Sequence, residues 1–322
     1  IDYDGSRTAT AASTNYSLQN YANDVVATVK EGCEPNNIPV PTLVSESGRA
    51  IASHFSVLVF NVLGSGGLQQ PAPPVEQDEP LIVRNLRDTF QGIEALPTDT
   101  PVDPSRLQEA WNDALKFKED ALAAFRLGYL SLKERSMAEQ LTWACARALL
   151  DRLSDDTKLP DDLKALPAVL AETYYANLSI FRSAPDTWAI QQLFPLMPLH
   201  RLNEKPTRLG HFADLTCDSD GKLNRFINDG QHKPLLELHP LKPNEPYLIG
   251  MFLGGAYQEV MGNLHNLFGS TDAAHIRLAP GGEYQVDHVV RGDTNADVLE
   301  MMEHDPDQLL ERLRMASEKA IS

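Results

Sequence analysis

The sequence predicts a mixed α/β protein that combines the end of a βα barrel, a β-sandwich or β-barrel domain, and an inserted helical bundle. A helix followed by a short buried strand, within residues 17–44, has the order of one βα-barrel unit. Residues 81–172 have a strongly helical composition. After residue 173 the pattern returns to short segments rich in β-branched and aromatic side chains, which favours strands.

The domain boundaries follow these changes in pattern. We expect the barrel segment to span residues 1–54, and the β domain with its terminal helices to comprise residues 55–67 and 173–322. Residues 68–172 are expected to form a linker and the helical bundle, because four prolines in residues 68–80 disfavour regular structure there.

The N-terminal region is predicted to contain one helix and one strand. Apolar side chains recur at helical spacing in residues 17–30, and Gly32 is expected to end that helix. Thr42-Leu43-Val44 is expected to be a buried strand, followed by acidic, glycine and basic residues at positions 46–49. Barrel enzymes keep their active sites at the C-terminal ends of such strands, so positions 46–49 are candidate site residues.

Residues 55–63 are predicted to be a strand because they are mostly β-branched and aromatic. Gly64-Ser65-Gly66-Gly67 is expected to be a flexible turn, since no helix follows it to complete a phosphate loop. In the helical region, Ser131 and Glu134 fit a capping box. Cys145 lies on the apolar stripe of the helix that follows, which predicts a buried core thiol.

The C-terminal region is predicted to alternate strands, turns and helices. We expect strands at residues 175–181, 214–216 and 247–253, a helix carrying Val260, Met261, Leu264 and Phe268, a hairpin at residues 274–290, a helix cap at Thr294, and a last helix after Asp305-Pro306.

Charge and cysteine content restrict the function classes. The net charge of −17 disfavours nucleic acid and anionic membrane as partners and is compatible with a cationic substrate. Three widely spaced cysteines indicate a reducing, cytoplasmic compartment. The first residues carry neither an initiator Met nor a signal region, so we expect the chain to begin inside a longer protein.

Two candidate sites carry acidic groups. The carboxylate of Glu46 could hold a pyridinium nitrogen protonated, while Arg49 could bind a phosphate and Gly48 allows close backbone approach. A plain surface ion pair is the alternative. Cys217-Asp218-Ser219-Asp220-Gly221 could bind a cation and supply a proton-donating thiol, or could be only an Asx turn closed by glycine. A cysteine protease is less favoured, because nearby acids disfavour a thiolate and no partner His is evident.

Two further residues could face a ligand. Tyr257 follows small residues at a predicted strand end, where its hydroxyl could reach a phosphate; a core tyrosine with one hydrogen bond is the alternative. Asp186 lies in a turn and is a weaker candidate.

Several stretches in the same order resemble the biosynthetic arginine decarboxylase family, within the fold-type III group that also holds ornithine and diaminopimelate decarboxylases. These stretches are Asp2-Tyr3-Asp4-Gly5-Ser6-Arg7, Glu46-Ser47-Gly48-Arg49-Ala50, Leu132-Lys133-Glu134-Arg135, Leu193-Phe194-Pro195, Thr216-Cys217-Asp218-Ser219-Asp220-Gly221, Gly255-Ala256-Tyr257-Gln258-Glu259 and Asn263-Leu264-His265-Asn266-Leu267-Phe268-Gly269. The resemblance implies an alanine-racemase-like (β/α)8 barrel, represented here by its C-terminal remnant.

The resemblance also implies pyridoxal 5′-phosphate as cofactor, L-arginine as substrate, and agmatine for polyamine and spermidine synthesis as product. Glu46 would pair with the pyridine nitrogen, and Gly48, Arg49 and Tyr257 would contact the phosphate. Cys217 would direct protonation from across a dimer interface. Mg²⁺ is a further cofactor of the family, without assignable ligands here.

Asp218 would help to hold the distal cation of the substrate, as the resemblance implies. Asp220 is an addition from geometry, because a guanidinium offers five donors that two carboxylates satisfy better than one. The implied assembly is a homodimer or higher oligomer with shared active sites.

One departure from the family pattern is serious. The Schiff-base lysine of the family lies upstream of a motif like residues 1–7, so the missing N-terminal half of the enzyme is an expected partner and this fragment alone is expected to be inactive. The alternatives are a non-catalytic homologue that binds or regulates a decarboxylase, and a decarboxylase of another basic amino acid.

Overall fold

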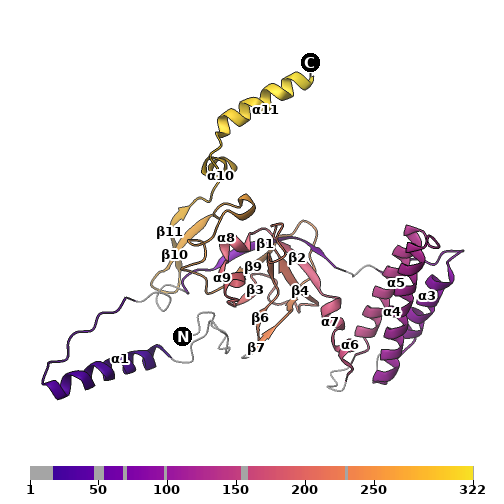
Figure 1. Ribbon diagram of the computed structural model, residues 1–322, viewed down its shortest axis with the longest axis horizontal. Helices are drawn as coiled ribbons and strands as arrows, with labels where there is room; N and C mark the ends of the chain where they lie inside the picture. The colour runs from indigo at the N-terminus through magenta and orange to yellow at the C-terminus, as the bar shows by residue number, and fades with distance from the viewer. Residues whose placement is uncertain are drawn as a thin grey trace.

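A seven-stranded sheet and a separate helical bundle form the two packed parts of the chain (Figure 1). The structure is a computed structural model that describes residues 17–46, 54–67, 71–97, 100–153, 159–228 and 231–321. This arrangement confirms the predicted combination of a β region with a helical bundle in a mixed α/β protein.

The sheet has the strand order β3-β9-β1-β2-β4-β5, and β8 pairs with β4 outside this path. Its strands are β1 (Leu58–Gly66), β2 (Glu172–Ala176), β3 (Leu196–Pro198), β4 (Arg208–Ala213), β5 (Lys222–Leu223), β8 (Leu236–Leu238) and β9 (Tyr247–Met251). The pairing of β2 with β4 is parallel, and the other pairings are antiparallel. A second, two-stranded sheet pairs β6 (Phe226–Asn228) with β7 (Gln231–Lys233).

Aromatic side chains fill the core of the main sheet. Phe60 of β1 and Phe212 of β4 pack edge to face with ring centroids 5.4 Å apart, in the geometry that aromatic pairs prefer. Tyr174 is fully buried, and its hydroxyl donates to the carbonyl of His239 at 3.0 Å. Burial raises the pKa of Tyr174, so this hydroxyl remains protonated and a donor.

The helical bundle consists of α3 (Leu81–Glu94), α4 (Pro104–Arg126) and α5 (Leu132–Leu150), followed by the short α6 (Asp161–Lys164) and α7 (Leu166–Val169). Its core includes Leu86, Trp111 and Leu141. The predicted capping box at Ser131 and Glu134 is confirmed. The predicted burial of Cys145 is also confirmed, and desolvation raises the pKa of its thiol to about 12.

Four segments extend away from these two cores (Figure 1). They are α1 (Leu18–Cys33) with the 3₁₀ turn η1 (Glu34–Asn36), the hairpin of β10 (Ala273–Leu278) and β11 (Tyr284–Val290), α10 (Asn295–Met301), and α11 (Pro306–Ile321). Ser17 caps α1 and Thr294 caps α10 with a full capping box. The predicted helices, the hairpin and the cap at Thr294 are therefore confirmed, although α1 continues through the expected stop at Gly32 and ends at Cys33.

Two predictions before residue 70 are wrong. Thr42-Leu43-Val44 is extended but is not a strand, and 90% of Val44 is exposed. A parallel barrel strand needs neighbours to accept its backbone hydrogen bonds, and no described strand lies beside it. The predicted turn at residues 64–67 is instead mostly the end of β1, where Gly66 leaves room for the ring of Tyr175.

Three predictions in the C-terminal region also need correction. The strand at residues 175–181 is split, because β2 ends at Ala176 and a helical turn, α8 (Ile180–Ser183), follows. The strand predicted at residues 214–216 ends earlier, at Ala213. The helix predicted through Val260 and Phe268 is absent. The 3₁₀ turn η2 (His265–Leu267) lies in this stretch, and the left-handed φ of 55° at Asn266 breaks the helical geometry there.

Candidate active site

A buried carboxylate organises the loop that carries Cys217. Asp214 directly follows β4 and is only 7% exposed. One of its oxygens accepts from the backbone N–H of Ile180 at 2.9 Å. The other accepts from the backbone N–H and the hydroxyl of Thr216 at 2.9 and 2.7 Å. Asp214 therefore joins the start of α8 to the start of the Cys217 loop.

Gly221 closes this loop against the same carboxylate. The N–H of Asp214 donates to the carbonyl of Gly221 at 2.8 Å. A Cβ atom added at Gly221 would lie 2.1 Å from Oδ1 of Asp214 and 2.6 Å from Oγ1 of Thr216. Only glycine fits here without displacing the buried carboxylate, so residues 214 and 221 together fix the ends of the loop.

The exposed part of the loop presents a thiol and two carboxylates. Cys217, Asp218 and Asp220 are all exposed. The N–H of Asp220 donates to Oδ1 of Asp218 at 2.9 Å, and the N–H of Gly221 donates to the carbonyl of Asp218 at 3.1 Å. The local structure is thus the Asx turn closed by glycine that the sequence allowed. Because the turn uses one oxygen of Asp218, its second oxygen and the Asp220 carboxylate face outward.

Asn266 contacts the candidate thiol directly. The N–H of Cys217 donates to Oδ1 of Asn266 at 3.3 Å, and Nδ2 of Asn266 donates to Sγ of Cys217 at 3.4 Å. The sequence reasoning assigned no role to Asn266, although it lies in one of the family-like stretches. The identity of the residue could have indicated a turn at position 266, because asparagine adopts left-handed backbone geometry more readily than most residues.

Tyr257 lies in an irregular loop after β9. Leu253, Gly255 and Tyr257 have positive φ angles of 59°, 119° and 72°, so this loop departs strongly from strand geometry. Tyr257 is half-buried. The next residue, Gln258, is buried and donates through Nε2 to Oδ2 of Asp186 at 2.9 Å.

The residues around Asp186 hold the Tyr257 loop in place. Asp186 is buried in the short helix α9 (Asp186–Ala189), and its carboxylate binds Gln258. Arg182 of α8 donates to the carbonyls of Glu259 and Gly262 at 2.7 and 3.0 Å, and it also bonds the hydroxyl of Ser270. The structure therefore ties the Tyr257 loop to the same α8 segment that Asp214 ties to the Cys217 loop.

The second group of predicted site residues lies apart from this network. Glu46 is exposed at the end of a segment without regular secondary structure, and among the described residues no hydrogen bond or ion pair joins it to Cys217. Gly48 and Arg49 lie outside the described residues. The structure thus brings Cys217, Asp218 and Asp220 together in one loop, and it leaves the Glu46 group untested.

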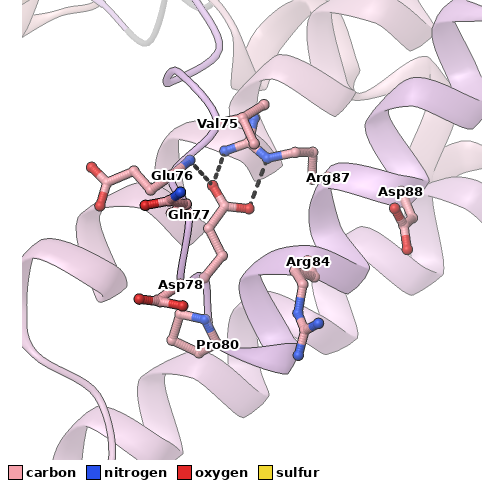
Figure 2. A pocket seen from close by; sticks show the side chains of 9 residues that line it. Val75, Glu76, Gln77, Asp78, Pro80, Arg84, Arg87 and Asp88 are labelled. Carbon is pink, nitrogen blue, oxygen red and sulfur yellow. Dashed lines mark hydrogen bonds and ion pairs between the residues drawn. The ribbon is translucent and has the colours of Figure 1, made fainter.

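A pocket of about 410 Å³ lies between the proline-rich linker and the first turns of α3 (Figure 2), and none of the predicted site residues lines it. Its wall contains the buried ion pair of Arg87 and Glu79, in which Nε of Arg87 donates to Oε2 of Glu79 at 2.9 Å. Arg87 also donates to the carbonyls of Pro73 and Pro74 at 2.9 and 3.1 Å. These hydrogen bonds fasten the proline-rich linker to α3 and give the pair a structural role.

The described part of the chain offers neither a metal site nor a membrane-spanning helix. No three His, Cys, Asp or Glu side chains there are grouped so that they could hold a metal ion. In the same residues, every helix is too short or too polar to span a bilayer.

The helical bundle matches a known protein family. Residues 76–167 match the family model described as "Arginine decarboxylase helical bundle domain". These residues contain α3, α4 and α5, so the bundle is one found in arginine decarboxylases.

The whole chain then matches one family of enzymes. It is 71% identical to the biosynthetic arginine decarboxylase of Parasynechococcus marenigrum and 72% identical to that of Synechococcus sp. strain RCC307, in both cases over 322 residues. The match covers 100% of this chain and 50% and 49% of those relatives, so the chain spans about half their length. The crystal structure of the biosynthetic arginine decarboxylase from Campylobacter jejuni superposes with a TM-score of 0.73 at 33% identity, covering 93% of this chain and 47% of that one. The resemblance to the biosynthetic arginine decarboxylase family is therefore confirmed along this chain.

Proposed function

We propose that this chain forms about half of an enzyme that decarboxylates L-arginine to agmatine and CO₂. The observation that carries the proposal is the 71% identity over the full chain to a biosynthetic arginine decarboxylase. The reaction breaks the bond between Cα and the carboxylate, releases CO₂ and adds one proton to Cα. The agmatine that it yields is a precursor for polyamines.

The acidic loop supplies recognition of the substrate in this proposal. The outward-facing oxygens of Asp218 and Asp220 would pair with the guanidinium of arginine, which presents donors in a planar fork. The net charge of −17 favours approach of such a cation. Cys217 beside these carboxylates would donate the proton to Cα and take another from solvent afterwards.

The side chains assigned to the cofactor fit pyridoxal 5′-phosphate by their chemistry. A carboxylate such as Glu46 suits a protonated pyridine nitrogen, and the guanidinium of Arg49 with the Tyr257 hydroxyl suits a phosphate. Gly48 and the positive-φ loop around Tyr257 would let the backbone approach that phosphate. When bound, the cofactor supplies an electron sink for the pair left on Cα.

The same proposal includes the organisation of the whole enzyme. Residues 1–54 would complete a (β/α)8 barrel whose other strands lie in the half of the relatives that this chain does not cover. Residues 55–67 and 173–322 would form the β domain, and residues 68–172 would form the linker and bundle insertion. Cys217 would reach a neighbouring subunit's active site in a cytoplasmic homodimer or larger oligomer.

The test is CO₂ release by the full-length enzyme that contains this chain, supplied with pyridoxal 5′-phosphate. Arginine, ornithine, lysine and diaminopimelate are compared at equal concentrations, with and without Mg²⁺. The proposal expects release from arginine to exceed the others by orders of magnitude. Preference for another basic amino acid would reassign the substrate, and no release from any of them would favour a non-catalytic, regulatory homologue.

A further inference from the structure

Asn266 forms a two-point contact with Cys217. Its Oδ1 accepts from the backbone N–H of Cys217 at 3.3 Å, and its Nδ2 donates to Sγ at 3.4 Å. One amide therefore holds both the main chain and the thiol of the same residue. We propose that Asn266 is a positioning residue that fixes the orientation of the Cys217 thiol for proton delivery, an inference that rests on the proposed decarboxylase function.

The backbone of Asn266 is shaped for this contact. Its φ and ψ are 55° and 26°, inside the left-handed region, and this conformation interrupts the 3₁₀ turn η2. Most side chains are strained there, whereas asparagine, aspartate and glycine accept it more readily. This left-handed conformation is incompatible with a continuous α-helix through residue 266.

Two loops that are both anchored to α8 meet at this contact. On one side, Asp214 and Gly221 fix the ends of the Cys217 loop through the buried carboxylate. On the other side, Arg182 holds the carbonyls of Glu259 and Gly262, and a Cβ at Gly262 would lie 1.8 Å from the carbonyl oxygen of Arg182. Asn266 thus extends from a fixed loop toward a thiol on another fixed loop.

The contact with Asn266 restricts the rotation of the exposed Cys217 thiol. A free cysteine side chain samples three staggered wells about χ1. The hydrogen bond from Nδ2 favours the well in which Sγ faces Asn266, so the sulfur occupies one direction rather than three. A proton donor held in one direction delivers its proton to one atom, and a donor that rotates also delivers it elsewhere.

A misplaced proton has a recognisable product. If the proton were added to the cofactor's carbon instead of Cα, the amino group of the substrate would stay on the cofactor, and water would supply the oxygen of a released aldehyde. The ratio of aldehyde to agmatine therefore reports the orientation of the donor, while KM for arginine reports binding by Asp218 and Asp220.

The experiment compares Asn266→Gly and Asn266→Asp in the full-length enzyme. Glycine keeps the left-handed backbone and removes both contacts, while aspartate keeps the acceptor for the Cys217 N–H and removes the donor to Sγ. We expect the ratio of aldehyde to agmatine to rise about threefold in both variants, because the free thiol would occupy the productive one of three χ1 wells only about a third of the time. KM for arginine should be unchanged. Cys217→Ala gives the upper limit of the aldehyde fraction.

A second readout does not depend on catalysis. Iodoacetamide alkylation of Cys217 at pH 8 is followed by mass spectrometry of the tryptic peptide of residues 209–222. Asn266→Asp is expected to slow alkylation several-fold, because its carboxylate repels the negative charge on the attacking sulfur. Asn263→Asp is the matched control, since the side chain of Asn263 is exposed in the same stretch and accepts from the N–H of His265, while its own backbone N–H donates to the carbonyl of Phe181.

The outcomes separate the inference from the proposed function. Failure of the unmodified enzyme to decarboxylate arginine would remove the proposed function, while the alkylation result would still test the contact. Normal decarboxylation with an unchanged aldehyde fraction and unchanged alkylation in both Asn266 variants would overturn the positioning role. An equal effect from Asn263→Asp would assign the change to loop charge alone and would also overturn it.

Discussion

Asp214 and Gly221 offer a sharp test of how the fold holds the candidate site. Replacing Asp214 with Ala removes three hydrogen bonds and leaves the buried N–H of Ile180 without its acceptor. Losing a charged acceptor for a buried donor costs about 3 kcal/mol. Since about 1.4 kcal/mol is a factor of ten in an equilibrium constant, local opening should become roughly a hundredfold more frequent.

Gly221→Ala tests the same place by adding an atom. The new Cβ would lie 2.1 Å from Oδ1 of Asp214, which is far inside contact distance. Overpacking of a rigid site costs about 1–3 kcal/mol. In the double variant the carboxylate is absent, so most of this clash disappears. The contact with Oγ1 of Thr216 at 2.6 Å remains, and relief is therefore incomplete.

The double-mutant cycle gives the decisive number. If each single change costs about 3 kcal/mol, additivity predicts roughly 6 kcal/mol, and relief of the clash predicts roughly 4 kcal/mol for the pair. The assay is hydrogen exchange of the backbone amides in residues 178–182 and 209–222 in the full-length enzyme. Additivity within about 0.5 kcal/mol would refute the view that these two residues close the loop against each other.

Three further predictions concern the helical bundle. Glu79→Ala should destabilise α3 by roughly 3 kcal/mol, because it leaves Arg87 buried without its partner. Lys133→Ala removes the exposed Lys133–Glu76 pair and should change the stability of α3 by less than about 0.5 kcal/mol. Hydrogen exchange of the backbone amides in residues 81–94 compares the two variants. A hydrogen bond from the Arg87 guanidinium lowers the pKa of Glu79 below the ordinary 4.5. The Glu79–Arg87 pair therefore stabilises α3 fully above pH 4.5, and this stabilisation is lost as the pH falls through the lowered pKa of Glu79. A difference in stability between the unmodified enzyme and Glu79→Ala that grew on acidification would contradict this sign. Cys145, with its pKa raised to about 12, should resist iodoacetamide at pH 8 in the folded enzyme while Cys217 reacts, and rapid labelling of the 136–147 peptide would show that the bundle core opens.

Local chemistry made much of the fold predictable. The helix caps at Ser131 and Thr294 and the hairpin within residues 274–290 depend on neighbours within a few residues, so their positions could be predicted from the sequence. The apolar stripe through Cys145 predicted its burial for the same reason. Segments whose structure depends on distant partners were less accessible, as the strand expected at residues 42–44 illustrates.

The candidate site also combines local features, which the sequence predicts, with long-range contacts, which it does not. The sequence by itself determined which side chains the acidic loop presents, because Cys217, Asp218 and Gly221 lie within one short segment and an Asx turn is a local structure. Only the tertiary structure decided what holds that loop. Asp214 binds Ile180 across 34 positions, and Asn266 binds Cys217 across 49 positions. Contacts at such separations depend on how β4, α8 and the loop after β9 pack together, and no periodicity or spacing along the chain records that packing.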